Sequence, residues 1–199
     1  MTPDSSLGSA AVAHPVGGFT ERKGTNLLKP EMEERLNTQF NLELYSAYLY
    51  YAMTAYFESL SLKGFSHWMS LQAQEELLHV SKLFHHINDR AGRVVFNAVE
   101  APPSVWDSPL KVMEAAYAHE CTVSERINEE VSFALSLNDH TSVTFLQWFV
   151  AEQVEEESVA DDIVQKLKII GDNSSALFLL DHELGQRPAV SIDAEAGDA

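Results

Sequence analysis

The sequence is short of the features that define several other classes of protein. Its 199 residues contain one cysteine, Cys121, so neither an intrachain disulfide nor a cysteine-based zinc or iron–sulfur site can form. No apolar run approaches the ~20 residues of a membrane span. The N-terminus also lacks the basic and then apolar segments of a secretory signal. We therefore expect a cytoplasmic protein with no membrane partner.

Positive charge is scarce as well. The chain has 13 Lys and Arg residues against 30 Asp and Glu residues, which gives a formal net charge of -17. Such a surface repels nucleic acid and anionic membranes and concentrates cations, although plain solubility accounts equally well for the charge alone. Hydrophobic residues make up 45% of the chain, enough for a sizeable core, so we expect one globular domain and no nucleic-acid partner.

Proline and glycine are rare in the middle of the chain, where they mark the ends of long helical segments. We expect helices from Pro30 to about Ser59, from after Gly64 to about Ala91, from Ser108-Pro109 to about Leu137, from about Thr141 to Ile170, and from Ala176 to about Leu184. Pro30 and Pro109 suit a first helical turn, and Gly92 and Gly171 suit the residue after a last turn. Ser174-Ser175 is a candidate cap for the short last helix.

The two ends of the chain show no helical periodicity. Residues 1–28 are rich in Gly, Ser, Ala and Pro and are expected to form a flexible N-terminal tail. Residues 186–199 are expected to form a flexible C-terminal tail. Residues 29–185 then make up a single all-α domain.

The connections between the helices indicate the topology. The first and second helices join tightly and so do the third and fourth, which makes each pair antiparallel. A helix of about 28 residues is ~42 Å long, whereas the connection over residues 92–108 can reach ~56 Å. It can therefore cross the whole domain. We predict a four-helix bundle with a long crossover between helices two and three, plus a short fifth helix.

The apolar stripe of each long helix carries a carboxylate near its middle. These mid-stripe polar residues are Glu43 in the first helix, Glu76 and His79 in the second, Glu120 in the third, and Glu152 and Glu156 in the fourth. Since the midpoints of antiparallel helices lie at similar heights, these side chains should converge. Clustered buried carboxylates repel one another and need a counter-charge, and no Lys or Arg lies at the centre of the stripes. Carboxylates with an imidazole and no thiolate suit iron or manganese.

Each motif alone is weak. Glu76-x-x-His79 and the acidic run 152–157 are each more often a solvated helix face, and Tyr50 is as consistent with a core aromatic as with a redox role. The joint placement of four carboxylates at one level favours a metal centre. An oxygenase-type di-iron enzyme stays an alternative, although the chain has little length for an organic-substrate pocket. A purely structural bundle is the other, and the buried carboxylates argue against it.

Three segments carry a resemblance to a known family: LKPEMEERLNTQFNLELYSAYLY, AQEELLH and FLQWFVAEQVEEE. With mid-bundle glutamates and a Glu-x-x-His, they resemble bacterial non-haem ferritins of the ferritin-like di-iron family over about residues 27–185. The resemblance implies an iron-storage protein with ferroxidase activity. Its substrates would be Fe(II) and O2 or H2O2, and its product a ferric mineral held in a homo-oligomeric shell of twenty-four subunits, a 24-mer.

The resemblance also implies roles for individual residues. A first iron would be held by Glu43, Glu76 and His79, and a second by bridging Glu76 with Glu120, near Gln153 and Glu156. A third iron position would be formed by Glu75, Glu152, Glu155 and Glu156. Tyr50 matches the tyrosine next to the first iron.

Departures from related families narrow the assignment. The methionine that ligates haem in bacterioferritin is replaced by Leu77, so no haem is expected. Bacterioferritin also has a second Glu-x-x-His on the fourth helix, whereas here Glu152, Gln153 and Val154 are followed by Glu155 and not by histidine. Mini-ferritins that coat DNA lack the fifth helix, and rubrerythrin needs four cysteines. The resemblance therefore favours a non-haem ferritin.

Overall fold

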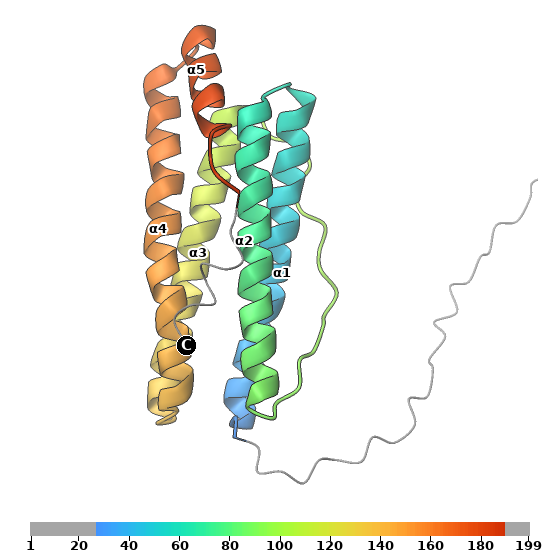
Figure 1. Ribbon diagram of the computed structural model, residues 1–199, viewed down its shortest axis with the longest axis vertical. Helices are drawn as coiled ribbons and strands as arrows, with labels where there is room; N and C mark the ends of the chain where they lie inside the picture. The colour runs from blue at the N-terminus through green and yellow to red at the C-terminus, as the bar shows by residue number, and fades with distance from the viewer. Residues whose placement is uncertain (1–26, 190–199) are drawn as a thin grey trace, which may run out of the picture.

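The computed structural model describes residues 27–189, which form five helices and, within that range, no strand. The helices are α1 (Pro30–Ser59), α2 (Lys63–Asp89), α3 (Pro109–Ser136), α4 (His140–Ile170) and α5 (Ser174–Leu184). Helices α1 to α4 stand side by side, and α5 lies at the end of the bundle where α2 begins and α4 ends (Figure 1). The predicted all-α bundle is confirmed. Most of both predicted tails lies outside the described residues. Among the described helices, none is long and apolar enough to cross a membrane.

Tight turns join the helices into two antiparallel pairs, α1 with α2 and α3 with α4. Ser61 lies in the first turn with a φ of 59°, and Asn138 lies in the second with a φ of 55°. Asp139 then caps α4, since its side chain accepts a hydrogen bond from the backbone N–H of Ser142. At the same end of the bundle, Arg90 donates to both carboxylate oxygens of Asp139, at 2.7 and 3.0 Å. The end of α2 is thereby fixed to the turn between α3 and α4.

The connection between α2 and α3 runs the length of the bundle along the outside of α1 (Figure 1). The side chains of two asparagines of α1 hydrogen-bond to backbone groups of this connection. Asn37 accepts from the backbone N–H of Val95 at 2.7 Å, and Asn41 accepts from that of Asn97 at 2.8 Å. Each asparagine also donates to a carbonyl of the connection. Because the connection crosses the whole bundle before α3 begins, α2 and α3 are parallel (Figure 1), as the length of the connection predicts.

Three helix ends differ from the predictions for local reasons. Gly64 was expected to break the chain, yet it lies in the first turn of α2, where α5 packs so closely that a Cβ would stand 1.5 Å from the carbonyl oxygen of Asp181. The left-handed residue after α2 is Ala91, with a φ of 61°, rather than Gly92. Helix α5 is capped by Asn173, whose side chain accepts from two backbone N–H groups, rather than by the two serines.

The hydrophobic core is divided into two clusters by a polar layer. One cluster includes Phe57 and Phe65 and reaches α5, and the other includes Phe40 and Phe149 near the start of α1. The buried polar and charged side chains of the layer between them are those of Gln39, Glu43, Gln72, Glu76, His79, Glu120 and Gln153. The two apolar clusters stabilise the bundle on either side of this layer.

Helix α5 also completes the N-terminus of α2. The residue before α2, Leu62, offers no side-chain acceptor. Asp181 of α5 supplies one, since its carboxylate accepts from the backbone N–H groups of Gly64 at 2.8 Å and Phe65 at 3.0 Å. A cap is thus provided by a residue more than a hundred positions away in the chain.

Replacing this remote cap should lower stability. Asp181→Ala removes the acceptor of two backbone donors and should cost about 1 kcal/mol, whereas Asp181→Asn keeps an acceptor oxygen and should cost a few tenths. Thermal unfolding followed by circular dichroism measures both. Melting temperatures equal to that of the wild type in both variants would show that the cap contributes nothing.

Candidate metal centre

The polar layer gathers side chains from all four long helices at mid-height. Glu43 comes from α1, Glu76 and His79 from α2, Glu120 from α3 and Glu156 from α4. Their ligand atoms form two sets within which all the atoms lie inside 4.8 Å of one another: Glu43, Glu76 and His79 form the first, and Glu76, Glu120 and Glu156 the second. Because Glu76 belongs to both, two cations bound here would be neighbours.

In the first set, each carboxylate has one buried oxygen without a hydrogen-bond partner. Glu43 is 0% exposed, and one of its oxygens accepts from Gln39 at 2.7 Å while Oε2 has no hydrogen-bond partner. Oε2 of Glu76 is likewise without one, and Nδ1 of His79 lies 3.4 Å from it. The imidazole is held between the ring edges of Trp148 and Phe149. Buried, unpaired carboxylate oxygens beside an imidazole fit a cation.

In the second set, neighbouring polar groups orient each carboxylate. The hydroxyl of Tyr50 donates to one oxygen of Glu120, and Nε2 of Gln153 donates to the other at 3.1 Å. Glu156 has one oxygen 3.4 Å from Nε2 of Gln72 and another with no partner. Gln153 and Tyr50 therefore fix Glu120, whereas Glu156 keeps one buried oxygen without a hydrogen-bond partner.

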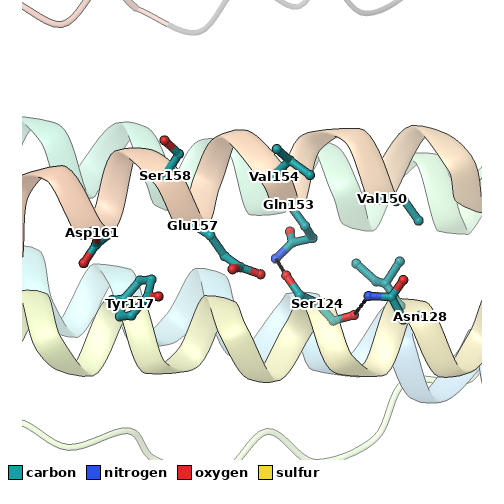
Figure 2. A pocket seen from close by; sticks show the side chains of 10 residues that line it. Tyr117, Ser124, Asn128, Val150, Gln153, Val154, Glu157, Ser158 and Asp161 are labelled. Carbon is teal, nitrogen blue, oxygen red and sulfur yellow. Dashed lines mark hydrogen bonds between the residues drawn. The ribbon is translucent and has the colours of Figure 1, made fainter.

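A groove between α3 and α4, with a volume of about 350 Å³, lies beside the second set. Figure 2 shows Gln153 of α4 reaching across it to Ser124 of α3, with Glu157 and Asp161 along the same side and Asn128 opposite. Its walls are polar and apolar in about equal parts, with Glu157 and Asp161 as the charged residues. The groove thus leads past two carboxylates to Gln153, which contacts Glu120 directly.

The residues expected at a third position lie on the flank of the layer. Glu75 is half-buried and paired with Arg187, whose Nη2 donates to it at 2.5 Å. Glu152 is half-buried too, and Glu155 is exposed. Glu152 was expected on the buried stripe, but Gln153 occupies that place, four residues after buried Phe149. Among the described residues, only Glu156 of the four enters one of the close sets.

Burial makes the empty layer electrostatically costly. It raises the pKa of Glu43 to about 8, with the neighbouring Glu76 charge adding to the effect. Burial likewise raises the pKa of Glu120 to about 7, and it raises those of Glu76 and Glu156 well above the usual range. At neutral pH the empty site therefore retains protons, which a cation would displace.

Several supporting residues were missed by the sequence interpretation. Gln39 lies one turn before Glu43 and orients it, a relation that the i, i+4 spacing makes visible in hindsight. His119 is hydrogen-bonded to Ser46 at 2.8 Å, and its ring lies edge-on to Tyr50. Burial lowers the pKa of His119 to about 4, so this imidazole is neutral at physiological pH.

Comparison with known proteins gives a consistent result. The family described as Ferritin-like domain matches residues 33–170. The chain is 37% identical to a bacterial non-heme ferritin of Escherichia coli over 158 residues, which covers 79% of this chain and 96% of the relative. It is 38% identical to one of Staphylococcus aureus, covering 81% and 97%. An open pore ferritin from Archaeoglobus fulgidus superposes with a TM-score of 0.80 at 53% identity, over 80% of this chain and 99% of that one.

The metal-free protein should lose stability as the pH rises from about 4.5 to about 8. In this range the folded chain holds protons on Glu43 and Glu120 that the unfolded chain has released, so unfolding becomes easier as the pH increases. Glu43→Gln should flatten this dependence. Melting temperatures measured with a chelator at several pH values check the slope.

The matched control is Glu125→Gln, which removes an exposed carboxylate of α3 instead. It makes the same chemical substitution at a solvated site and should leave the slope unaltered. If both variants flatten the slope equally, general charge repulsion rather than the buried layer is responsible.

Proposed function

The chain belongs to the family of ferritin-like domain proteins, and from this premise we propose that it is an iron-storage protein with ferroxidase activity. Its substrates are Fe(II) and O2 or H2O2, and its product is a ferric mineral stored inside a multimeric shell. The observation that carries the proposal is the pair of buried ligand sets that share Glu76. A shared ligand is what two adjacent irons require if they are to react together.

Charge balance supports two divalent ions at this place. Glu43, Glu76, Glu120 and Glu156 carry four negative charges when ionised, and two Fe(II) ions carry four positive ones. Binding would displace the protons that burial retains on Glu43 and Glu120. The centre is therefore neutral with two ferrous ions, whereas one ion leaves an uncompensated buried charge.

Oxidation then takes one electron from each iron. The two electrons and two protons convert O2 to H2O2, or convert H2O2 to two water molecules. The layer now holds two additional positive charges that its four carboxylates cannot balance. Ferric ions consequently bind hydroxide or oxide from water and move toward further carboxylates, which favours growth of mineral in an acidic cavity. In this reaction the carboxylates act as ligands, and Tyr50 and Gln153 hold Glu120 in place.

The groove between α3 and α4 supports an ionic rather than an organic substrate. About half of its lining is apolar, from Ile127, Val150 and Val154, but it also carries the carboxylates of Glu157 and Asp161, which suit cations. An oxygenase-type enzyme binds its organic substrate in a mainly apolar pocket. The two carboxylates beside Gln153 therefore favour ferroxidase activity over oxygenase activity.

Removing the shared ligand should abolish paired oxidation. Glu76→Ala leaves each ligand set with two members, so fast oxidation of two Fe(II) per subunit should fall by at least about a hundredfold. The empty variant should nevertheless be as stable as the wild type or more stable, because one of several repelling buried carboxylates is gone. Stopped-flow absorbance under oxygen and calorimetric melting measure the two effects.

Glu155→Ala is the matched control, since this exposed glutamate is outside both sets. Its first two irons should oxidise at a near-normal rate, with altered turnover only after later additions. Wild-type kinetics in Glu76→Ala would rule out the paired centre, and unfolding of that variant would support a structural role for the carboxylates.

The proposed shell predicts that α5 is covered by other subunits. With 11 residues it is too short to be stable alone, and it leaves Phe178 and Leu179 70% and 68% exposed. Light scattering should show a particle of about twenty-four 22.2 kDa subunits. Phe178→Glu should yield smaller species, whereas Val154→Glu, which alters an equally exposed residue among the acidic side chains of α4, should not. A stable wild-type monomer would contradict the shell.

A further inference from the structure

An arginine from beyond α5 lies against the proposed third iron position. Arg187 is three residues past the end of α5, and its side chain extends along α2. Its Nη2 donates to Glu75 at 2.5 Å, and its Nη1 donates to the side-chain oxygen of Gln72 at 3.1 Å. The guanidinium also stacks over Trp68, 4.9 Å from the ring centroid. Successive turns of one face of α2 thus hold the guanidinium.

The junction of α5 with α2 determines where Arg187 lies. Its backbone carbonyl is 2.9 Å from Nε2 of His67, and its backbone N–H donates to Leu184 at 3.3 Å. The same junction includes the Asp181 cap and the close approach of Gly185 to Gly64. Arg187 is therefore placed by a packed helix end. Both Arg187 and Glu75 keep 24% of their side-chain surface exposed, so the pair can separate into solvent.

The arginine is also connected to the second ligand set through one side chain. Gln72 accepts from Arg187 with its oxygen and donates to Glu156 with its nitrogen, at 3.1 and 3.4 Å. A guanidinium can only donate and an ionised carboxylate can only accept, so the two contacts select one orientation of the amide. The state of the arginine is thereby coupled to the position of Glu156.

We propose that Arg187 is a positioning residue that pairs with the Glu75 carboxylate while no metal is bound. The guanidinium must be displaced before a cation binds at the third iron position, the one that the family resemblance assigns to Glu75 and the acidic run of α4. This inference rests on the proposed iron-storage function. A cation beside Glu75 would compete with the guanidinium for the same oxygen and would be repelled by its charge. The two mid-bundle positions, which have no cationic side chain at their ligand oxygens, fill first. Once Arg187 leaves, Gln72 loses the contact that orients it, and Glu156 is freer to turn toward the third ion.

Anaerobic Fe(II) titration by calorimetry on the assembled protein tests this order of binding. The wild type should bind two ions per subunit tightly and a third more weakly. Arg187→Gln removes the charge but keeps an amide donor, and it should bind the third ion about tenfold more tightly, a difference of about 1.4 kcal/mol. Its first two affinities should stay unchanged. Arg187→Lys, which keeps the charge, should remain closer to the wild type.

Two further variants make the result specific. Arg126→Gln removes an equal charge from an exposed site on α3 and should leave the third affinity unaltered. In a Glu75→Gln background, Arg187→Gln should have little additional effect, since the pair is already broken. A third affinity that is equal in the wild type and Arg187→Gln, or raised as much by Arg126→Gln, would overturn the proposal, as would the absence of a third ion in both proteins. Loss of the first two ions in the wild type would instead refute the di-iron function.

Discussion

The rest of the structure depends on the repulsion among carboxylates buried at mid-height in the bundle. Four glutamates this close together and largely shielded from solvent cannot all ionise without counter-charge, and within residues 27–189 no Lys or Arg belongs to the buried layer. Burial raises the pKa of Glu43 to about 8, which shows how strongly the empty site disfavours its own charges. The two apolar clusters on either side stabilise a layer that would not hold together alone. A cation at this layer would relieve the repulsion, which is why the proposed function places iron there.

Helix α2 connects this layer to the remainder of the chain. One of its faces carries Trp68, Gln72, Glu75 and His79 in succession, with Glu76 contributing to both ligand sets. The first turn of the same helix is completed by Asp181 of α5, and its middle is contacted by Arg187. A change at the end of α5 can therefore reach the ligands by a continuous series of contacts.

Local pattern was enough to predict the four helices, the long crossover and the convergence of Glu43, Glu76 and Glu120. Helical spacing determines which side chains share a face, and chain length limits where a connection can reach. The contacts between Asp181 and Gly64 and between Arg187 and Glu75 could not be predicted in this way. They join residues separated by 117 and 112 positions, and no periodicity marks them. Arg187 lies in a segment that the sequence pattern assigned to a flexible tail.

The location of the arginine follows from the same electrostatic constraint. A guanidinium is charged at every physiological pH, so one placed at the centre would pair permanently with one of the carboxylates and repel an arriving cation. At the edge, the same group holds Glu75 while the position is empty and can withdraw into solvent because the pair is partly exposed. Under the proposed iron-storage function, the central positions need a counter-ion that arrives and leaves, whereas the flank can use one that belongs to the chain. The proposed order of iron binding rests on this difference between the centre and the flank.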